Sequence, residues 1–296
     1  MDTVTGRLLC GIGGFYYVET ADGEWECKAR GIFRRSGKTP VAGDLVKVSP
    51  LANGKGVLED ILPRKNCLIR PPVANLDYLV IVASIKQPEP HLLVLDKMIA
   101  IAEHKEIEPI IVFNKSDLAD TSELCALYRN AGFTVLAVSA ETGDGIEALR
   151  DRLTGKIAAF TGNSGVGKSS ILNRLDERLG LETAEISSVL GRGKHTTRSS
   201  TLHKQPGGGY FVDTPGFSSL DMERLEPIPK EDLPYCFREF VPHIGNCRFA
   251  SCRHMKEPDC AVRIAVKAGK IAASRISSYD SMMEEALARP DWEKRL

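Results

Sequence analysis

The run Gly162-Asn163-Ser164-Gly165-Val166-Gly167-Lys168-Ser169 constrains the fold more than any other stretch of this sequence. It follows the apolar residues Ile157–Phe160 and opens a helical pattern, so it lies at a strand-to-helix turn. Glycines at such a turn let successive backbone N–H groups face a phosphate. Lys168 can reach the outer phosphates, and the Ser169 hydroxyl can ligate Mg²⁺. The sequence therefore predicts a nucleotide-binding phosphate loop that extends from Gly162 to Ser170; a glycine-rich turn without a ligand is the alternative.

The residues around this loop alternate between apolar strands and helical patterns. Strands are expected at Leu79–Ser84, Pro109–Phe113, Thr134–Val138 and Ile157–Phe160, and helices at Leu92–His104, Ser122–Asn130, Ile146–Leu153 and from Lys168 onward. Continuous apolar strands that alternate with helices indicate a parallel sheet covered on both faces. We therefore expect a doubly wound α/β domain over residues 66–222.

The segments on either side have a different texture. Residues 1–65 contain short alternating runs separated by turn signals, such as Gly14–Glu19, Glu24–Ala29 and Asp44–Val48. This pattern predicts a small closed β-barrel of the OB type, although an SH3-like barrel fits nearly as well. Residues 223–296 show no strand series, and helical patterns occur at Val262–Ile276 and Tyr279–Leu287. The chain is thus expected to be a multi-domain α/β protein with a C-terminal helical segment.

The tetrad Asn114-Lys115-Ser116-Asp117 predicts which base the nucleotide carries. It directly follows the strand Pro109–Phe113, where doubly wound sheets place their ligands. A carboxylate such as that of Asp117 can accept both the N1–H and the exocyclic amine of guanine, whereas adenine would leave it unpaired. Ser139-Ala140 ends the next strand and is expected to contact the guanine O6 through its backbone. The predicted ligand is therefore GTP or GDP.

Two further motifs complete a GTPase site. Asp213-Thr214-Pro215-Gly216 follows an apolar run; Asp213 is expected to hold Mg²⁺ through a water, and the Gly216 N–H to sense the γ-phosphate. Gly191–Arg198 is glycine-rich and basic, which suggests a switch loop whose Thr197, with Thr196 as second choice, completes the Mg²⁺ shell. A plain basic loop is the alternative.

The residue after Gly216 is Phe217, where many GTPases carry a glutamine that orients the attacking water. Phenylalanine cannot do this, so slow intrinsic hydrolysis is expected. His195, in the predicted switch loop, or a partner would then supply the missing polar group. The candidate catalytic residues are accordingly His195, Lys168 and Thr197.

The order of these motifs is unusual. In the usual GTPase the phosphate loop comes first and the guanine tetrad late, but here Asn114–Asp117 precedes Gly162–Ser169 and Asp213–Gly216 comes last. A parallel sheet tolerates such a circular permutation because its connections can be cut and rejoined at the surface. One consequence is that the γ-phosphate-sensing loop leads directly into the C-terminal segment.

Four soft metal ligands lie within a short stretch of the C-terminal segment, in the pattern Cys247-x₄-Cys252-x-His254-x₅-Cys260. A Cys₃His set gives a closed tetrahedral zinc site, which is structural because it leaves no position for a reactive water. The segment is poor in apolar residues, so the metal would contribute folding energy. Cys236 and His243 are nearby competitors, and a set of free cysteines is the alternative.

The formal net charge of the 296 residues is zero, so contacts with a polyanion must come from local patches. Two basic patches are candidates for binding RNA phosphates, although each fits a solvated face as well: Lys28, Arg30, Arg34, Arg35 and Lys38 in the barrel, and Arg263, Lys267 and Lys270 near the C-terminus. The apolar stretches are shorter than the ~20 residues of a membrane span, and no secretory signal is visible. We expect a cytoplasmic protein, and nothing in the sequence suggests more than a monomer.

Taken together, these motifs resemble the ribosome small-subunit-dependent GTPase A family of bacteria. The likeness covers the barrel, the permuted motifs and the set Cys247, Cys252, His254 and Cys260. The resemblance implies a GTPase that binds the small (30S) ribosomal subunit and its rRNA late in maturation, with hydrolysis stimulated by the subunit and coupled to release. The alternatives are a ribosome-independent regulatory or metal-delivery GTPase, and an RNA-binding scaffold that senses GTP with little turnover.

Overall fold

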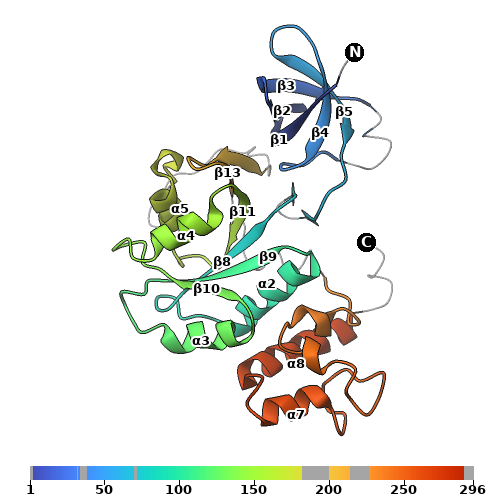
Figure 1. Cartoon of the computed structure of the whole chain (residues 1–296), viewed down its shortest axis with the longest axis vertical. Helices are drawn as coiled ribbons and strands as arrows, with labels where there is room; N and C mark the ends of the chain where they lie inside the picture. Colours follow the sequence, from blue (N-terminus) through green and yellow to red (C-terminus); the bar gives the residue numbers. More distant parts are fainter. Residues whose placement is uncertain are drawn as a thin grey trace.

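The computed structural model describes residues 3–31, 33, 39–69, 72–181, 200–213 and 227–289, with only the backbone described at residue 213. Figure 1 shows three parts along the longest axis: a β-barrel at one end, a sheet covered by helices in the middle, and a helical segment at the other end. The short strands β6 (Cys67–Leu68) and β7 (Val73–Ala74) pair in the connection between the barrel and the sheet.

The barrel closes from five strands in the order β1-β2-β3-β5-β4, with β1 also paired to β4 and β3 parallel to β5. The strands are β1 (Val4–Ile12), β2 (Phe15–Thr20), β3 (Gly23–Ala29), β4 (Leu45–Pro50) and β5 (Lys55–Ile61). Alternate residues such as Leu8, Val18, Val46 and Leu58 point inward and are fully buried. This arrangement is an OB-type barrel, so the prediction of that class over the SH3-like alternative is confirmed.

The central sheet has six strands in the order β10-β9-β8-β11-β13-β12, in which only the β12–β13 pair is antiparallel. The strands are β8 (Tyr78–Ser84), β9 (Glu108–Asn114), β10 (Thr134–Ala137), β11 (Lys156–Thr161), β12 (Thr201–Lys204) and β13 (Gly209–Asp213). β8, β9 and β10 precede β11, the strand of the phosphate loop, along the chain, whereas β12 and β13 follow it. The expected doubly wound sheet with permuted motifs is therefore confirmed.

Both faces of this sheet are covered, because successive strand residues point to opposite sides. Leu79, Ile81 and Phe113 belong to one core, which lies under α2 (Leu92–His104) and α3 (Ser122–Asn130). Val80, Val82, Val112 and Phe160 belong to the other, under α4 (Ile146–Leu153) and α5 (Lys168–Leu175). Figure 1 shows α4 and α5 together on one side of the sheet and α2 with α3 on the other. A short 3₁₀ helix, η1 (Glu177–Leu179), follows α5.

The C-terminal segment contains two 3₁₀ helices, η2 (Leu233–Cys236) and η3 (Val241–His243), followed by α7 (Ala261–Lys267) and α8 (Ala273–Ala288). The helical pattern at Val262–Ile276 is not continuous in the structure, because α7 ends at Lys267 and α8 begins at Ala273. Gly269 has a φ of +71°, and the Lys270 N–H donates to the Ala265 carbonyl at 3.0 Å. This hydrogen bond closes a left-handed helix end, which terminates α7 and lets α8 begin in a new direction.

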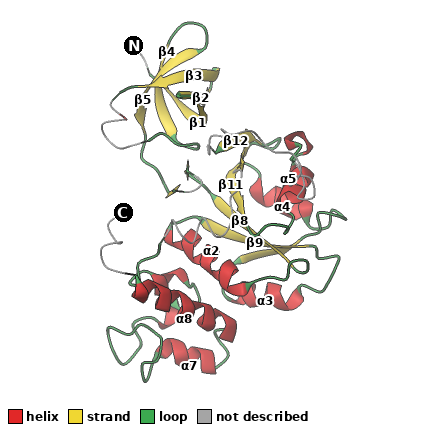
Figure 2. Cartoon of the chain, turned by 180° about the vertical axis from the view of Figure 1, so that it is seen from behind, coloured by secondary structure: helices red, strands yellow, loops and turns green. Residues whose placement is uncertain are grey.

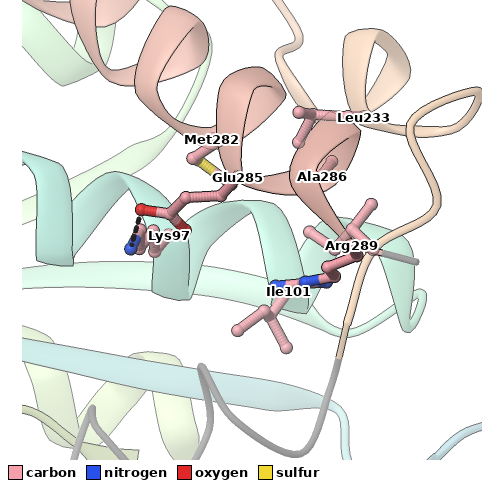
Figure 3. A pocket seen from close by; sticks show the side chains of 8 residues that line it. Lys97, Ile101, Leu233, Met282, Glu285, Ala286 and Arg289 are labelled. Carbon is pink, nitrogen blue, oxygen red and sulfur yellow. Dashed lines mark hydrogen bonds and ion pairs between the residues drawn. The ribbon is translucent and has the colours of Figure 1, made fainter. Parts of the chain in front are cut away.

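α8 packs against α2, so the C-terminal segment is docked on the α2 side of the sheet (Figure 2). Lys97 of α2 donates to Glu285 of α8 at 2.9 Å. Figure 3 shows this ion pair at the edge of a small pocket between the two helices, floored by Ile101, Leu233 and Met282. Ile228 also lines this pocket. Within the described part of the chain, every helix is too short or too polar to cross a membrane.

Candidate functional site

The phosphate loop lies between β11 and α5, at the carboxyl edge of the parallel sheet. Gly167 has a φ of +92° and directly precedes α5, and Gly162 has a φ of +143°. The Lys168 ammonium donates to the carbonyl oxygens of Gly162 and Asn163, both at 2.8 Å, and burial lowers the pKa of this lysine. The lysine is thereby held within the loop, and half-buried Ser169 follows it in the first turn of the helix.

Asn114 joins this loop to the loop that follows β10. Its side-chain Nδ2 donates to the Val166 carbonyl at 2.8 Å, and its Oδ1 accepts from the Ala140 N–H at 3.1 Å. The side chain is only 2% exposed, and it packs so closely over Gly167 that a Cβ there would lie 2.2 Å from Nδ2. One amide therefore fixes three sequence motifs relative to one another, and one Nδ2–H remains for a ligand.

Asp117 is held by the same neighbouring loop. The buried Ser139 hydroxyl donates to Asp117 Oδ1 at 2.5 Å, while the Ser139 backbone N–H donates to the Asp144 carbonyl at 2.9 Å. Ser116, which directly precedes Asp117 in the tetrad, donates its N–H to the Val138 carbonyl at 3.1 Å. Because a carboxylate has two oxygens with about four acceptor sites, Asp117 keeps free acceptor capacity for a base. The structure thus brings together the predicted residues Asn114, Asp117, Ser139 and Ala140 with the phosphate loop.

Two contacts of this site have no signal in the sequence. Lys115, with a φ of +62°, donates from its ammonium to the carbonyl of Gln87, in the loop after β8. Arg174, near the end of α5, donates from Nε to the Ala140 carbonyl at 2.8 Å and from Nη2 to the Glu141 carbonyl at 2.6 Å. Neither contact could be found from spacing, because each joins segments whose proximity is created only by the folded sheet.

The four predicted zinc ligands form a compact cluster. Their ligand atoms all lie within 4.8 Å of one another, with Sγ of Cys247 and Cys260 4.0 Å apart. His254 Nδ1 lies 3.5 Å from Cys247 Sγ and 3.4 Å from Cys260 Sγ. A tetrahedral zinc ion would give edges of about 3.8 Å between two sulfurs and about 3.5 Å between sulfur and nitrogen. The donor set therefore fits a zinc ion ligated by Nδ1 of His254 and the three Sγ atoms.

Hydrogen bonds outside the cluster support its ligands. The Arg263 Nε donates to the His254 carbonyl at 2.8 Å, and the Ala261 N–H donates to Cys247 Sγ at 3.3 Å. Burial lowers the pKa of His254, which favours the neutral imidazole that binds a metal. The competitor Cys236 instead donates its thiol to the Asp232 carbonyl at 3.5 Å and is not part of the cluster. His243, at the end of η3, is not part of it either.

The basic side chains predicted to contact RNA differ in their exposure and in whether they form ion pairs within the protein. Lys28 is exposed, with its ammonium 5.1 Å from the Phe15 ring centroid, and Arg30 is exposed but paired with Glu59 at 2.9 Å. Lys267 and Lys270 are exposed at the end of α7. Arg263 is turned inward, since it pairs with Asp280 and donates to the His254 carbonyl. The other three candidates, Arg34, Arg35 and Lys38, lie outside the described residues.

The predicted switch elements also fall largely outside the described residues. His195, Thr196 and Thr197 lie in the gap between residues 181 and 200, and Gly216 and Phe217 in the gap between 213 and 227. Of Asp213 only the backbone is described, at the end of β13, beside β11 in the sheet. Thr201, at the start of β12, pairs with Asp213, at the end of β13, so these two described residues lie side by side in the sheet.

Solved structures of other proteins share this architecture. YjeQ from Thermotoga maritima superimposes with a TM-score of 0.81 at 36% identity, covering 98% of this chain and 100% of that one. YloQ, described as a circularly permuted GTPase, gives a TM-score of 0.81 at 33% identity over 98% of this chain and 96% of that one.

Curated relatives match along nearly the whole sequence. Two proteins named "Small ribosomal subunit biogenesis GTPase RsgA" are 46% identical, from Caldanaerobacter subterraneus subsp. tengcongensis, and 45% identical, from Moorella thermoacetica. The alignments cover 96% of this chain in both cases, and 96% and 98% of the relatives. The family model for the RsgA N-terminal domain matches residues 5–58, and the model for the RsgA GTPase matches residues 61–223, which is more than half of the chain. The protein therefore belongs to the RsgA GTPase family.

Proposed function

We propose that this protein binds GTP with Mg²⁺, hydrolyses it, and acts in the biogenesis of the small ribosomal subunit. The observation that carries the nucleotide part is the bridge made by Asn114 between Val166 of the phosphate loop and Ala140 of the loop after β10. This bridge sets a phosphate-binding element and a base-binding element at a fixed separation. The name shared by the curated relatives supports the ribosomal part.

Guanine would be recognised by Asp117, whose carboxylate is oriented by the Ser139 hydroxyl. It would accept the N1–H and exocyclic amine of the base, while the remaining N–H of Asn114 and the backbone at Ala140 face its other edge. Lys168 would exchange its two carbonyl partners for phosphate oxygens, which compensate its charge better than neutral carbonyls do. An adenine base would leave Asp117 unpaired, which is costly for a carboxylate withdrawn from water.

Ser169, Thr197 and Asp213 would hold Mg²⁺, which neutralises charge on the phosphates when bound. The Gly216 N–H would contact the γ-phosphate. Because Phe217 cannot orient a water, we assign that role to His195, completed by the ribosomal partner. In single-turnover hydrolysis with subunits present, His195→Ala should lower the rate by a factor on the order of 10². An unchanged rate would eliminate the histidine from the mechanism.

The barrel and the C-terminal segment would contact rRNA from opposite ends of the molecule. Lys28 and Arg30 in the barrel, together with Arg34, Arg35 and Lys38, and Lys267 and Lys270 at the end of α7, would supply cations for phosphates. A zinc ion held by Cys247, Cys252, His254 and Cys260 would keep the C-terminal segment folded. Since β13 leads through the γ-phosphate-sensing residues into that segment, hydrolysis would change its presentation and release a cytoplasmic, monomeric factor from the subunit.

The decisive experiment is GTP turnover by the purified protein, alone and with small ribosomal subunits. We expect a slow basal rate that rises by at least about a hundredfold with the subunits, and no subunit-dependent turnover for Lys168→Ala. Large ribosomal subunits serve as the matched control for nonspecific RNA. An equal response to both subunits, or to neither, would overturn the ribosomal assignment and favour a ribosome-independent GTPase. An absence of turnover under every condition would instead favour a scaffold that only senses GTP.

A further inference from the structure

Arg174 holds the loop after β10 from outside the nucleotide site. Its Nε donates to the Ala140 carbonyl at 2.8 Å and its Nη2 to the Glu141 carbonyl at 2.6 Å, so one planar guanidinium binds two successive peptide groups. Arginine suits this task because its N–H groups diverge in a fixed plane, which a lysine ammonium cannot reproduce. The contact joins α5 to residues 33 and 34 positions earlier in the chain.

The Ala140 residue is therefore held on both its polar groups. Its N–H donates to Asn114 Oδ1 at 3.1 Å, and its carbonyl accepts from Arg174. Hydrogen bonds inside the loop involve other groups: the Thr142 N–H donates to the Ser139 hydroxyl at 3.1 Å, and the Gly143 N–H to the Ser139 carbonyl at 2.8 Å. Within the described part of the chain, Arg174 is the hydrogen-bond partner of both the Ala140 and the Glu141 carbonyl.

The backbone from which Arg174 extends is itself fixed. Leu172 and Leu175, on either side of it in α5, are buried in the core beneath α4. Arg150 of α4 donates from Nη2 to the Arg174 carbonyl at 2.8 Å and pairs with Glu147 of its own helix. α5 thus begins at the phosphate loop with Lys168. Less than two turns later, its Arg174 binds the loop after β10.

We propose that Arg174 is a positioning residue for guanine recognition. Its bonds to the Ala140 and Glu141 carbonyls fix the peptide between these two residues, so that the Glu141 N–H of that peptide points to the O6 of the base, and they tie this orientation to the helix that carries the phosphate loop. The inference rests on the proposed function, in which this loop reads guanine. Arg174 touches neither base nor phosphate and acts through the loop that it holds.

The test compares nucleotides that differ at position 6 of the base. GDP and IDP both carry an oxygen there, whereas 2-aminopurine riboside diphosphate carries a hydrogen. This nucleotide keeps the 2-amino group that Asp117 accepts but lacks the N1–H, so the affinity of each nucleotide is compared only between Arg174→Ala and the parent. Affinities are measured by calorimetry for the full chain and for Arg174→Ala. Because each lost bond involves a charged donor at an exposed position, we expect GDP and IDP to bind about five- to tenfold more weakly. Binding of the 2-aminopurine nucleotide should change by less than about twofold, within ordinary additivity error.

Two further variants separate positioning from general destabilisation. Arg178→Ala removes a neighbouring exposed arginine whose side chain bonds Asp176 and the Lys204 carbonyl instead of this loop, so all three affinities should be retained. Arg174→Lys keeps the charge and can reach one carbonyl but not both. Its affinities for GDP and IDP should therefore lie between those of Arg174→Ala and the parent, and its affinity for the 2-aminopurine nucleotide should not change. It also keeps the test informative if the alanine variant fails to fold.

An equal loss of affinity for all three nucleotides would overturn the inference. It would mean that Arg174 supports α5, which carries the phosphate loop, rather than the loop after β10. Unchanged affinities for all three would overturn it as well. Failure of the proposed function is a separate result: the parent chain itself would then not bind GDP. If the parent binds GDP and the loss follows the 6-oxygen, both the site and the role of Arg174 are supported.

Discussion

The guanidinium of Arg275 in α8 donates to the carboxylate of Asp96 in α2 at 2.6 Å, with the two side chains 1% and 0% exposed. Arg275 also donates to Glu239 at 2.6 Å and lies 4.5 Å from the Phe237 ring centroid. Burial disfavours its charge, but Asp96 and Glu239 outweigh that effect and raise the pKa of Arg275. The C-terminal segment is therefore joined to the GTPase domain through a buried ionic cluster.

Arg275→Ala should destabilise the protein by about 3–5 kcal/mol, because it leaves Asp96 and Glu239 buried without their cation. Urea unfolding followed by circular dichroism measures this loss. Arg248→Ala is the matched control: its ion pair with Asp259 spans 3.1 Å, but the side chains are 64% and 67% exposed, so it should cost less than about 1 kcal/mol. Similar small losses for the two variants would contradict a structural role for the buried cluster.

Cys252→Ala should abolish zinc binding, whereas Cys236→Ala should retain an equimolar amount of zinc. Both cysteines belong to the C-terminal segment, but only Cys252 is in the Cys₃His cluster. Because the stretch between Cys247 and Cys260 has few buried apolar residues, loss of the metal should also open it to proteolysis. Elemental analysis and limited trypsin digestion check the two expectations. Zinc retained by the Cys252 variant would mean that the ligand set is different.

Several elements follow directly from the sequence. The expected helices Leu92–His104, Ser122–Asn130 and Ile146–Leu153 match α2, α3 and α4 at both ends. Their apolar positions face a sheet whose central strands β8, β9 and β11 are mostly apolar, so local pattern and tertiary burial agree. The helix break at Gly269 was missed, because a glycine within a helical pattern is compatible with either continuation or a left-handed end.

In the candidate site, too, some residues could be predicted from the sequence and others could not. The loops carrying Asn114, Asp117 and Lys168 have sequence signals, because nucleotide chemistry restricts the residue types and spacing there. Arg174 has none, since its two carbonyl partners accept from any suitably placed donor and their position depends on the sheet order. Arg263 shows the converse: a run of positive charge predicted an RNA contact, but the fold uses this arginine to bind Asp280 and the His254 carbonyl. A sequence shows which residues are charged, but it does not show whether their side chains point to solvent or into the protein.

Low pH should weaken the contact between the barrel and the central sheet. Glu19 of β2 accepts from Lys204 of β12 at 2.6 Å and from the Tyr210 hydroxyl of β13. The hydrogen bond from Lys204, followed by that from Tyr210, holds the pKa of Glu19 below its ordinary value of 4.5. A carboxyl whose pKa is lower in the folded state stabilises that state above its ordinary pKa, and this stabilisation is lost as pH falls through the folded value.

Glu19→Gln should therefore cost about 0.5–1 kcal/mol at neutral pH, discounted because Lys204 is 65% exposed, and progressively less below pH 4.5. Urea midpoints can be followed by the fluorescence of Trp25, in β3, in a Trp292→Phe background that leaves it the only tryptophan. Tyr210→Phe removes one of the two donors and should show a smaller pH dependence. A constant difference between parent and Glu19→Gln from pH 7 to pH 3 would contradict the assignment.

Gly167→Ala should abolish nucleotide binding through a steric effect on Asn114. The added Cβ would lie 2.2 Å from Nδ2 of Asn114, a side chain that is 2% exposed and cannot move aside without leaving Val166 and Ala140. Gly208→Ala, in the turn between β12 and β13, is the matched control: its φ of +85° imposes a similar backbone strain of about 1–2 kcal/mol, but nothing lies within 4 Å of its Cβ. Calorimetric titration with GDP should show binding for Gly208→Ala and none for Gly167→Ala, with both variants folded. If the two variants bind equally well, the bridge made by Asn114 does not set the geometry of the site; if only Gly167→Ala fails, the phosphate loop and the base loop function as one unit joined at this amide.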